Sequence, residues 1–417
     1  MRHLYTILLY AMLPYILLRL IWRARRQRGY LRHVAERFGF YGDTPAAQPC
    51  LWVHAVSVGE TRAAEPLIRA LQARYPRHRI LLTHMTPTGR DTGEAVFGDG
   101  VMRAYLPYDL PGAVARFVEH FRPAAGVVME TEVWPNLIHA ARRRDLPLYL
   151  VNARLSARSL AGYRRTGALA RDALAAFAAI AAQSAADAER LQALGAARVT
   201  VTGNLKFDLA PSDAQLEQGR AWRAAVGARP VVLAASTREG EEALLLDAVL
   251  RAGAGDVLWV IVPRHPQRFD SVAALITARG LRLQRRSAGT AIARDTQVLL
   301  GDSMGEMAVY YALSDVVLMG GSFLDFGAHN LIEPCAAAKP VIVGPSTYNF
   351  TDAAEAAHAA GAALSVETME VAVTLALQLL ADAPRRAQMG SAGVAFTAAH
   401  RGATQRVVAL IRPHGLM

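Results

Sequence analysis

The chain has 417 residues, enough for two or three domains, and 53% of them are hydrophobic, which indicates folded protein throughout. Its two cysteines, Cys50 and Cys335, are too few for a disulfide framework or a cysteine-rich zinc site, so we expect a reducing compartment. The net charge of +11 comes from 44 arginines and two lysines, Lys206 and Lys339, and predicts anionic partners. Because no zinc finger, aromatic-basic RNA motif or helix-turn-helix signature is present, an acidic membrane surface is favoured over nucleic acid.

The first predicted element is a membrane anchor. Residues 4–22 form an apolar run that only Pro14 and Arg19 interrupt, close to the ~20 residues that cross a bilayer. Seven arginines lie between Arg19 and Arg37 against one acid, Glu36, so this flank and the chain after it should stay cytoplasmic. A cleaved signal peptide is the alternative, but no small-residue cleavage site precedes the arginines. We expect an uncleaved anchor that either spans the membrane or lies in its interface.

After the basic segment, short apolar runs alternate with helical stretches, which predicts an α/β fold with parallel, doubly wound sheets. A polar stretch around Pro211 reads as a linker between two Rossmann-like domains that face a cleft. The predicted boundaries are 1–38 for the anchor and basic segment, 39–208 for the first domain, 209–220 for the linker, and 221–417 for the second domain with a terminal helix. The predicted strands are 51–56, 80–85, 102–106, 126–129, 148–152, 180–183, 199–202, 231–235, 258–262, 297–300, 316–319 and 341–343.

Glu60 follows the first of these strands, in the motif Ser57-Val58-Gly59-Glu60. Reactive groups of open α/β sheets lie at the carboxyl ends of strands, and a glycine here would let the backbone turn sharply. Glu60 therefore occupies the place of a general base. A carboxylate that simply favours a helix N-terminus explains the same residue equally well.

Two further segments of the first half carry polar groups after strands. Glu130 and Glu132 follow strand 126–129, and on extended chain they would point to the same side, where they could hold a metal or set the charge of a site. Solvated loop acids are the commoner explanation. Lys206 ends the last strand of the first domain, and its position favours an anion-binding role.

In the second half, prolines on both sides of Arg264 and His265 stiffen a loop that presents both side chains, and an arginine fork suits phosphate oxygens. The segment 301–306 precedes a predicted helix, whose free amides would bind phosphate. A second predicted helix is entered at Asn330, and Glu333 in it could hold ribose hydroxyls. No Walker loop, dinucleotide fingerprint or Ser-His-acid order is present, which disfavours ATPase, dehydrogenase and nucleophilic hydrolase chemistry.

Together the motifs resemble the 3-deoxy-D-manno-octulosonic acid (Kdo) transferases of lipid A synthesis, over nearly the whole chain. One departure is Leu331, where we expect proline in some members. The motifs that carry the resemblance are Ser57-Val58-Gly59-Glu60, Glu130-Thr131-Glu132 with Trp134-Pro135, 152–156, 203–208, 263–266, Met304-Gly305-Glu306 and Asn330-Leu331-Ile332-Glu333.

The resemblance implies a GT-B glycosyltransferase fold and transfer of Kdo from CMP-Kdo to lipid IVA, on the cytoplasmic face of the inner membrane. It implies Glu60 as general base, with Glu130 and Lys206 supporting the transition state. No metal or cofactor is expected, because fixed cations would stabilise the leaving nucleotide. The residues implied for CMP binding are Arg264, His265, Met304, Gly305, Glu306, Asn330, Leu331, Ile332 and Glu333.

Three alternatives remain at this point. A GT-B enzyme could use a UDP-sugar and another lipid acceptor. From a different class, a membrane-tethered scaffold could bind anionic lipid without catalysis, and a nucleic-acid binder is the third. Turnover of a donor panel separates the first, CMP release the second, and a salt-sensitive shift with nucleic acid the last.

Overall fold

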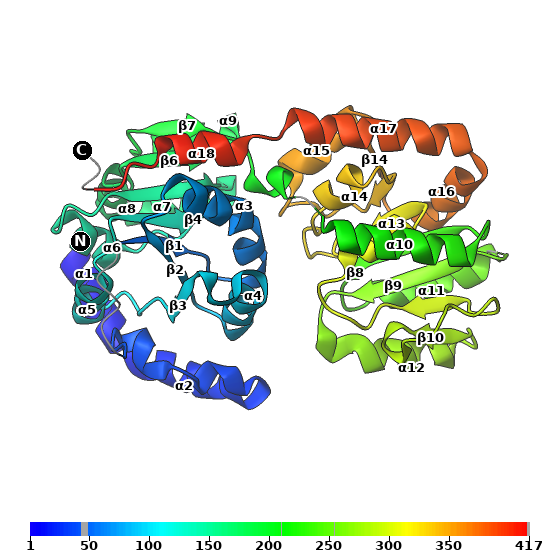
Figure 1. Ribbon diagram of the computed structural model, residues 1–417, viewed down its shortest axis with the longest axis horizontal. Helices are drawn as coiled ribbons and strands as arrows, with labels where there is room; N and C mark the ends of the chain where they lie inside the picture. The colour runs from blue at the N-terminus through cyan, green and yellow to red at the C-terminus, as the bar shows by residue number, and fades with distance from the viewer. Residues whose placement is uncertain (43–48, 210, 254, 415–417) are drawn as a thin grey trace. The chain divides into compact units, whose positions relative to one another are not determined.

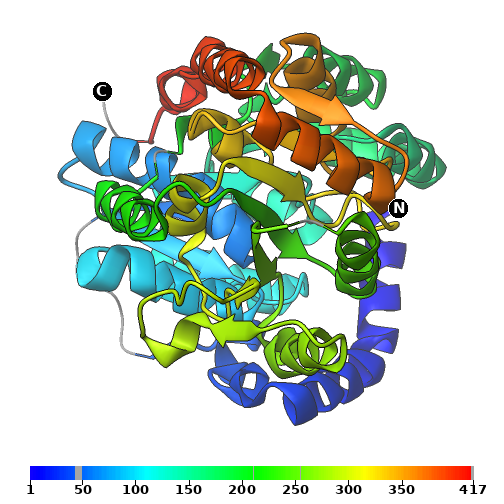
Figure 2. The ribbon, with the colours of Figure 1, turned by 90° about the vertical axis from the view of Figure 1, so that its right-hand side faces the viewer.

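A computed structural model describes residues 1–42, 49–209, 211–253 and 255–414. The chain divides into two compact units, Met1–Leu209 with Arg401–Met417, and Ala210–His400. Each unit contains a seven-stranded sheet in which every pairing between neighbouring strands is parallel, with helices on both faces (Figures 1 and 2). The predicted α/β class and the two Rossmann-like units are confirmed.

The sheet of unit 1 has the strand order β3-β2-β1-β4-β5-β6-β7. Strand β1 pairs with β2 on one side and with β4 on the other, so the order of the chain reverses between β1 and β4. This reversal is the topological switch point, at which ligands of open α/β sheets bind beyond the carboxyl ends of the strands. The strands are β1 (Cys50–His54), β2 (Arg79–His84), β3 (Met102–Tyr105), β4 (Ala125–Met129), β5 (Leu148–Ala153), β6 (Ala179–Ala182) and β7 (Val199–Val201).

Alternate residues of β1 enter two different cores, because successive side chains of a strand point to opposite faces. Trp52 packs with Phe117 and Leu137, whereas Leu51 and Val53 belong to the core on the other face. A sheet buried on both faces explains why its strands read as continuous apolar runs. The helices of unit 1 are α1 (Arg2–Ala11), α2 (Leu13–Arg26), α3 (Val58–Arg74), α4 (Pro87–Phe97), α5 (Pro111–Phe121), α6 (Pro135–Arg142), α7 (Ala157–Thr166), α8 (Ala168–Ala175), α9 (Ala185–Ala193) and α18 (Ala403–Leu410).

The sheet of unit 2 has the order β10-β11-β9-β8-β12-β13-β14, with its switch point between β8 and β12. Its strands are β8 (Val231–Thr237), β9 (Leu258–Pro263), β10 (Leu283–Arg285), β11 (Val298–Leu300), β12 (Val316–Met319), β13 (Val341–Val343) and β14 (Ala363–Ser365). Its helices are α10 (Asp213–Val226), α11 (Glu241–Ala252), α12 (Phe269–Ala278), α13 (Met307–Leu313), α14 (Ile332–Ala336), α15 (Thr351–Ala359), α16 (Met369–Ala381) and α17 (Ala383–Ala399).

All twelve predicted strands are present, and the sequence analysis missed only β10 and β14 among the described residues. Both lie at sheet edges and have three residues each. An edge strand pairs on one side only and is partly exposed, so it need not have the continuous apolar run that identified the central strands.

The predicted boundaries are wrong in two places. The terminal helix α18 belongs to unit 1, because its apolar face, with Val407 and Ile411 both unexposed, completes the core that also contains Leu67 of α3. Residues 213–220 of the predicted linker form the first turns of α10 in unit 2, and Ala210 lies outside the described residues.

The predicted anchor is a pair of helices instead of a single one. Helices α1 and α2 meet at Met12 with a bend of 51°, and Pro14 lies in the first turn of α2. Within the described residues no single helix is long and apolar enough to cross a membrane, although the bent pair has the length and composition to do so. Proline at the second helical position suits the start of a helix but cannot continue one from before it.

Candidate active site

Glu60 lies in the first turn of α3, directly after the carboxyl end of β1. Its Oε2 accepts a hydrogen bond from Val56 N at 2.8 Å, and its Oε1 accepts one from Ser57 Oγ at 3.1 Å. Ser57, with an extended backbone, is the residue at which the helix begins. The side chain thus folds back over the β1–α3 turn, and each oxygen retains a lone pair for a further donor.

The reason given for Gly59 from the sequence is wrong. Gly59 lies inside the first turn of α3 and its φ is not positive, so no sharp turn requires glycine there. A Cβ built on Gly59 would meet no atom within 4 Å. The glycine therefore leaves open space next to Glu60, which suits the approach of another molecule.

The environment of Glu60 raises the pKa of its carboxyl group from 4.5 to about 7. Burial is the largest cause, and the negative charge of Glu130 is the second; the charge of Glu132 adds to it. The hydrogen bonds from Val56 and Ser57 oppose the shift. A carboxyl group with a pKa near neutrality can accept a proton at physiological pH, which is the property that a general base needs.

Glu130 follows β4 and has a left-handed backbone, with φ +57°. The prediction that Glu130 and Glu132 point to the same side assumed an extended backbone, and that assumption is wrong. Their charges nevertheless act on the same group, Glu60. Non-glycine residues in this conformation are strained, and such strain concentrates at functional sites. Glu132 accepts a hydrogen bond from Trp134 Nε1 at 2.7 Å, and burial raises its pKa.

Lys206 lies 3.8 Å from Glu130, measured from Nζ to Oε1, and both side chains are mostly shielded from solvent. Two side-chain amides hold the backbone around Lys206. Asn204 Oδ1 accepts a hydrogen bond from Lys206 N at 3.0 Å, and Asn152 Oδ1 accepts one from Leu205 N at 3.0 Å. The structure thus brings Glu60, Glu130 and Lys206 together in unit 1. All three lie beyond the carboxyl ends of strands: Glu60 after β1, Glu130 after β4 and Lys206 after β7. The switch point lies between β1 and β4, so Glu60 and Glu130 flank it.

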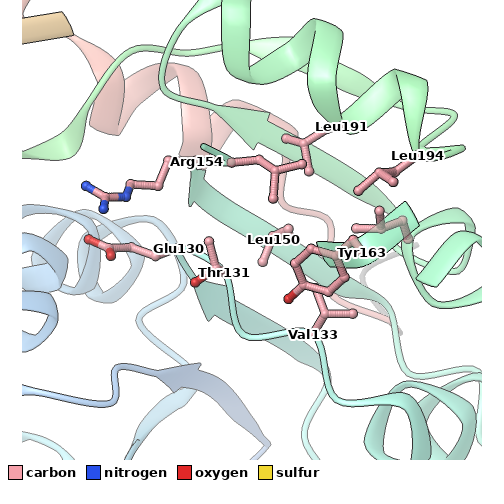
Figure 3. A pocket seen from close by; sticks show the side chains of 10 residues that line it. Glu130, Thr131, Val133, Leu150, Arg154, Tyr163, Leu191 and Leu194 are labelled. Atoms are coloured by element: carbon pink, nitrogen blue, oxygen red, sulfur yellow. The ribbon is translucent and has the colours of Figure 1, made fainter. Parts of the chain in front are cut away.

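A small cavity adjoins Glu130 (Figure 3). In Figure 3 the carboxylate of Glu130 and the guanidinium of Arg154 extend to the same side, whereas the ring of Tyr163 and several leucines surround the apolar part. The sequence analysis did not identify Tyr163, because it lies on α7 rather than after a strand. The cavity places apolar surface immediately beside a charged group. Its remaining lining residues are Thr131, Val133, Leu150, Leu155, Leu174, Leu191 and Leu194.

In unit 2, Arg264 and His265 follow β9 as predicted, and Arg238 follows the neighbouring strand β8. Within the described ranges neither Arg238 nor Arg264 forms an ion pair with a carboxylate. Burial lowers the pKa of Arg264, and the charge of Arg238 contributes in the same direction. Arg238 also lies over the ring of Phe326, at 4.3 Å from its centre. Two neighbouring guanidinium groups of this kind have the charge and the donors to bind an anion.

Buried acids fix the backbone around this cationic group. Glu241 is fully buried and accepts hydrogen bonds from the backbone N–H groups of Arg238, Gly321 and Phe323, at 2.8, 2.7 and 3.0 Å. Glu242, also fully buried, forms a two-pronged ion pair with Arg268, at 2.6 and 2.8 Å. These contacts hold the ends of β8, β9 and β12 without using Arg264 or His265.

His329 joins the same group, although the sequence analysis did not assign it a role. Its pKa is lowered from 6.5 to about 3, chiefly by burial and also by the charges of Arg264 and Arg238, so the imidazole stays neutral at physiological pH. Its buried Nε2 has no hydrogen-bond partner among the described residues. The rule that functional residues follow the ends of strands could have identified both Arg238 and His329. Arg238 directly follows β8, which ends at Thr237, and the segment after β12 leads to His329.

The predicted nucleotide segments differ in how much of each side chain is available. Met304 is 54% exposed, Gly305 has φ +79°, and Glu306 forms an ion pair with Arg286 at 3.1 Å. Helix α13 begins at Met307, directly after them, which confirms the predicted helix.

Asn330 to Glu333 form a tight turn before and into α14. Asn330 Oδ1 accepts from Ile332 N at 3.1 Å, and Asn330 Nδ2 donates to Glu333 Oε1 at 2.8 Å. The side chains of Leu331 and Ile332 are buried, so only their backbones are available to a ligand. Helix α14 has five residues and begins at Ile332, two residues after the predicted entry at Asn330.

Comparison with solved structures confirms that this architecture is the GT-B fold. A crystal structure of a glycosyltransferase from Rickettsia africae aligns with a TM-score of 0.59 and 12% identity, covering 87% of this chain and 97% of that one. At this identity the likeness concerns the fold alone, and it matches the two Rossmann-like units described above.

The chain belongs to the family of 3-deoxy-D-manno-octulosonic acid transferases, and is therefore a glycosyltransferase. The family model described as 3-Deoxy-D-manno-octulosonic-acid transferase (kdotransferase) matches residues 32–209. The transferase of Bordetella pertussis is 49% identical over 423 residues, covering 98% of each chain. That of Haemophilus influenzae is 38% identical over 420 residues, covering 99% of this chain and 98% of its own.

Proposed function

We propose that this protein transfers Kdo from CMP-Kdo to lipid IVA with inversion at the anomeric carbon, in lipopolysaccharide synthesis on the cytoplasmic face of the inner membrane. Glu60 is the general base. The observation that carries the proposal is a partly buried carboxyl group with a pKa of about 7, beside open space at the switch point of unit 1. A carboxylate placed only to favour a helix start needs no raised pKa.

The proposed reaction is a single displacement. A hydroxyl oxygen of the acceptor attacks the anomeric carbon, and its proton passes to the carboxylate of Glu60 as the new C–O bond forms. The bond between that carbon and the phosphate oxygen breaks, and CMP leaves with the electron pair. Attack from the side opposite the leaving group inverts the anomeric configuration.

Each unit contributes charged groups that suit the proposed reaction. Lys206 places a positive charge 3.8 Å from Glu130 and would stabilise negative charge that develops during transfer. Arg264 and His265, with the backbones of 304–306 and 330–333, would hold the nucleotide. These groups require no metal or other cofactor, so we expect the rate to be insensitive to a chelator.

The test measures CMP release and product mass with purified protein, CMP-Kdo and lipid IVA. Glu60→Gln should lower kcat roughly 1,000-fold while CMP binds as in the wild type, because general base catalysis is worth about 10²–10⁴. Glu65→Gln is the matched control, since Glu65 lies on the same helix in an exposed ion pair with Arg69 at 2.8 Å. NMR of the product reports the anomeric configuration.

Two outcomes contradict the proposal at different points. A nearly active Glu60→Gln variant removes Glu60 from the role of base. Turnover of UDP-sugars without turnover of CMP-Kdo rejects the donor and favours a related GT-B transferase with another lipid acceptor.

A further inference from the structure

Helices α1 and α2 carry an apolar surface that no other described part of unit 1 covers. Residues 1–22, which include most of both helices, contribute more than half of the large hydrophobic side chains that are exposed in the described residues. Tyrosines and a tryptophan occur along this surface, as they do at membrane interfaces. The most exposed of these side chains are Leu4, Ile7, Leu8, Tyr10, Tyr15, Leu18, Ile21 and Trp22, each 51–66% exposed.

The opposite face of α1 is bonded to the body of unit 1. Arg2 Nη1 donates to Asn136 Oδ1 at 3.3 Å, and Thr6 Oγ1 donates to the same oxygen at 3.1 Å. Tyr5 forms a hydrogen bond with Asp109. Asn136 and Asp109 are each only 2% exposed, so these contacts lie beneath the helix instead of at a solvated edge. In Figure 1, α1 accordingly runs beside α6.

The receiving residues are themselves firmly held. The carboxylate of Asp109 accepts from Asn136 N at 2.9 Å and from Leu137 N at 2.7 Å, at the start of α6. Asn136 Nδ2 donates to Asp109 O at 2.7 Å. Helix α6 directly follows the segment that carries Glu130 and Glu132. The contacts of α1 therefore end on the same stretch of chain that shapes the pKa of Glu60.

The two helices are poorly suited to crossing a bilayer. At 1.5 Å per residue, ten and fourteen residues span roughly 15 and 21 Å, against a hydrocarbon core of about 30 Å. Crossing as a pair would straighten or submerge the bend and would pull Arg2 and Thr6 away from Asn136. Both ends are basic, with Arg2 before the apolar surface and Arg19 and Arg25 at its far end, so the positive-inside rule keeps both ends on one side.

We propose that α1 and α2 lie in the plane of an anionic membrane without crossing it, and that the Asp109–Asn136 contacts bind α1 to the segment carrying Glu130. The exposed apolar side chains enter the interface, and the exposed arginines Arg19, Arg25, Arg28 and Arg32 meet acidic headgroups. The inference rests on the proposed function in one respect, namely that the acceptor is a membrane lipid. It adds that these contacts hold the segment carrying Glu130 at a fixed distance from the membrane surface.

Sidedness of labelling tests the in-plane arrangement. A single cysteine on a short Gly/Ser extension ahead of Met1 is compared with Asp99→Cys, a fully exposed position of unit 1. The native Cys50 and Cys335 are buried and give little background. In membrane vesicles of known orientation, a membrane-impermeant maleimide should label both introduced cysteines from the same side. Labelling of the N-terminal cysteine from the opposite side overturns the proposal, whatever the activity of the protein.

A second measurement tests the contacts with Asn136. The double variant Arg2→Gln/Thr6→Val loses them without changing Asn136, and Thr92→Val, which loses an exposed intrahelical hydrogen bond of α4, is the control. With acceptor in anionic vesicles the double variant should be roughly tenfold slower, because small misplacements of reacting groups are costly. With acceptor dispersed in detergent it should match the wild type.

Equal rates in both formats, or equal loss in both, overturn the positioning role of these contacts. A protein that releases no CMP from CMP-Kdo in either format would instead contradict the proposed function, so the two failures are distinguishable.

Discussion

Each unit has a seven-stranded parallel sheet with one switch point, and the charges beyond the two switch points are opposite. In unit 1 the groups beyond the switch point are carboxylates, Glu60, Glu130 and Glu132, and burial raises the pKa of the first and last. In unit 2 the groups beyond the switch point are Arg238, Arg264 and His329, and burial lowers the pKa values of Arg264 and His329. The strand order fixes where each cluster lies, and the side chains decide what each can bind.

The opposite charges of the two units suit different steps of the proposed reaction. Crowded, desolvated carboxylates hold protons until nearly neutral pH, so unit 1 suits proton transfer from a hydroxyl group. Guanidinium groups without a carboxylate partner attract anions, so unit 2 suits a nucleotide phosphate. Lys206 is the exception in unit 1, since it places a cation next to Glu130. Removing single charges from each unit tests this division.

The largest of the expected effects below belongs to Lys206→Met. Loss of the cation beside Glu130 should reduce kcat roughly 100-fold, as removal of one transition-state donor does. Lys339→Met is the matched control, because Lys339 is the only other lysine and its Nζ donates to Ser314 O in unit 2. Initial rates at saturating donor and acceptor compare the two variants. Similar losses in both variants would show that Lys206 has no special part in the reaction.

In unit 2, Arg264→Gln should weaken CMP binding roughly 10- to 100-fold, since hydrogen bonds to charged groups contribute about 1.5–3 kcal/mol. Arg279→Gln, which breaks an ion pair with Asp247 elsewhere in unit 2, should leave the affinity unchanged. Titration calorimetry with CMP gives both dissociation constants. An unchanged affinity in Arg264→Gln would remove this residue from the nucleotide site.

The pH profile of the reaction tests how the carboxylates of unit 1 interact. Glu60 must be deprotonated to act as a base, so kcat/KM should rise with pH through the pKa of about 7. Glu130→Gln removes a negative charge that raises this pKa, and should shift the rise to lower pH. Glu119→Gln, at an exposed carboxylate paired with Arg144, should not shift it. A midpoint that stays unchanged in Glu130→Gln would exclude coupling between the two acids.

The smallest effect is on stability. The carboxyl of Glu60 binds its proton more tightly in the folded state, so the free energy of unfolding should fall as pH rises from about 4.5 to 7. The slope contributed by one proton is at most about 1.4 kcal/mol per pH unit. Glu60→Gln should flatten this part of the profile, measured by urea denaturation across the range. An identical slope in variant and wild type would contradict the raised pKa.

Most of the fold was predictable because the central strands of a sheet that is buried on both faces are continuous apolar segments in the sequence. The strands β10 and β14 were missed because each is a three-residue strand that ends in a polar residue, whereas the edge strand β7 reads Val199-Thr200-Val201. The sequence located Glu60, Glu130 and Lys206 by the rule that strand ends carry function. It could not give the left-handed backbone of Glu130, because no local pattern of residues indicates it.

Partners of the site were predicted less well where no strand end pointed to them. Tyr163 lies on a helix, and Asn136 reaches α1 across 130 residues or more, so neither contact has a local signal. The burial of Leu331 and Ile332 could not be predicted either, because a sequence motif does not show whether a residue contacts a ligand through its side chain or its backbone.

Helix α18 has a consequence for how the protein is made. Unit 2 is one uninterrupted stretch of chain, whereas unit 1 needs residues from both ends. Tyr75 OH donates to Ile411 O at 2.9 Å, and Asp208 accepts from Gly402 N and Thr404 N at 2.7 and 2.6 Å, so the last helix closes the unit that carries Glu60. During synthesis, unit 2 is complete before α18 can close unit 1. The core under α3, the helix that carries Glu60, therefore finishes assembling after unit 2 has been made.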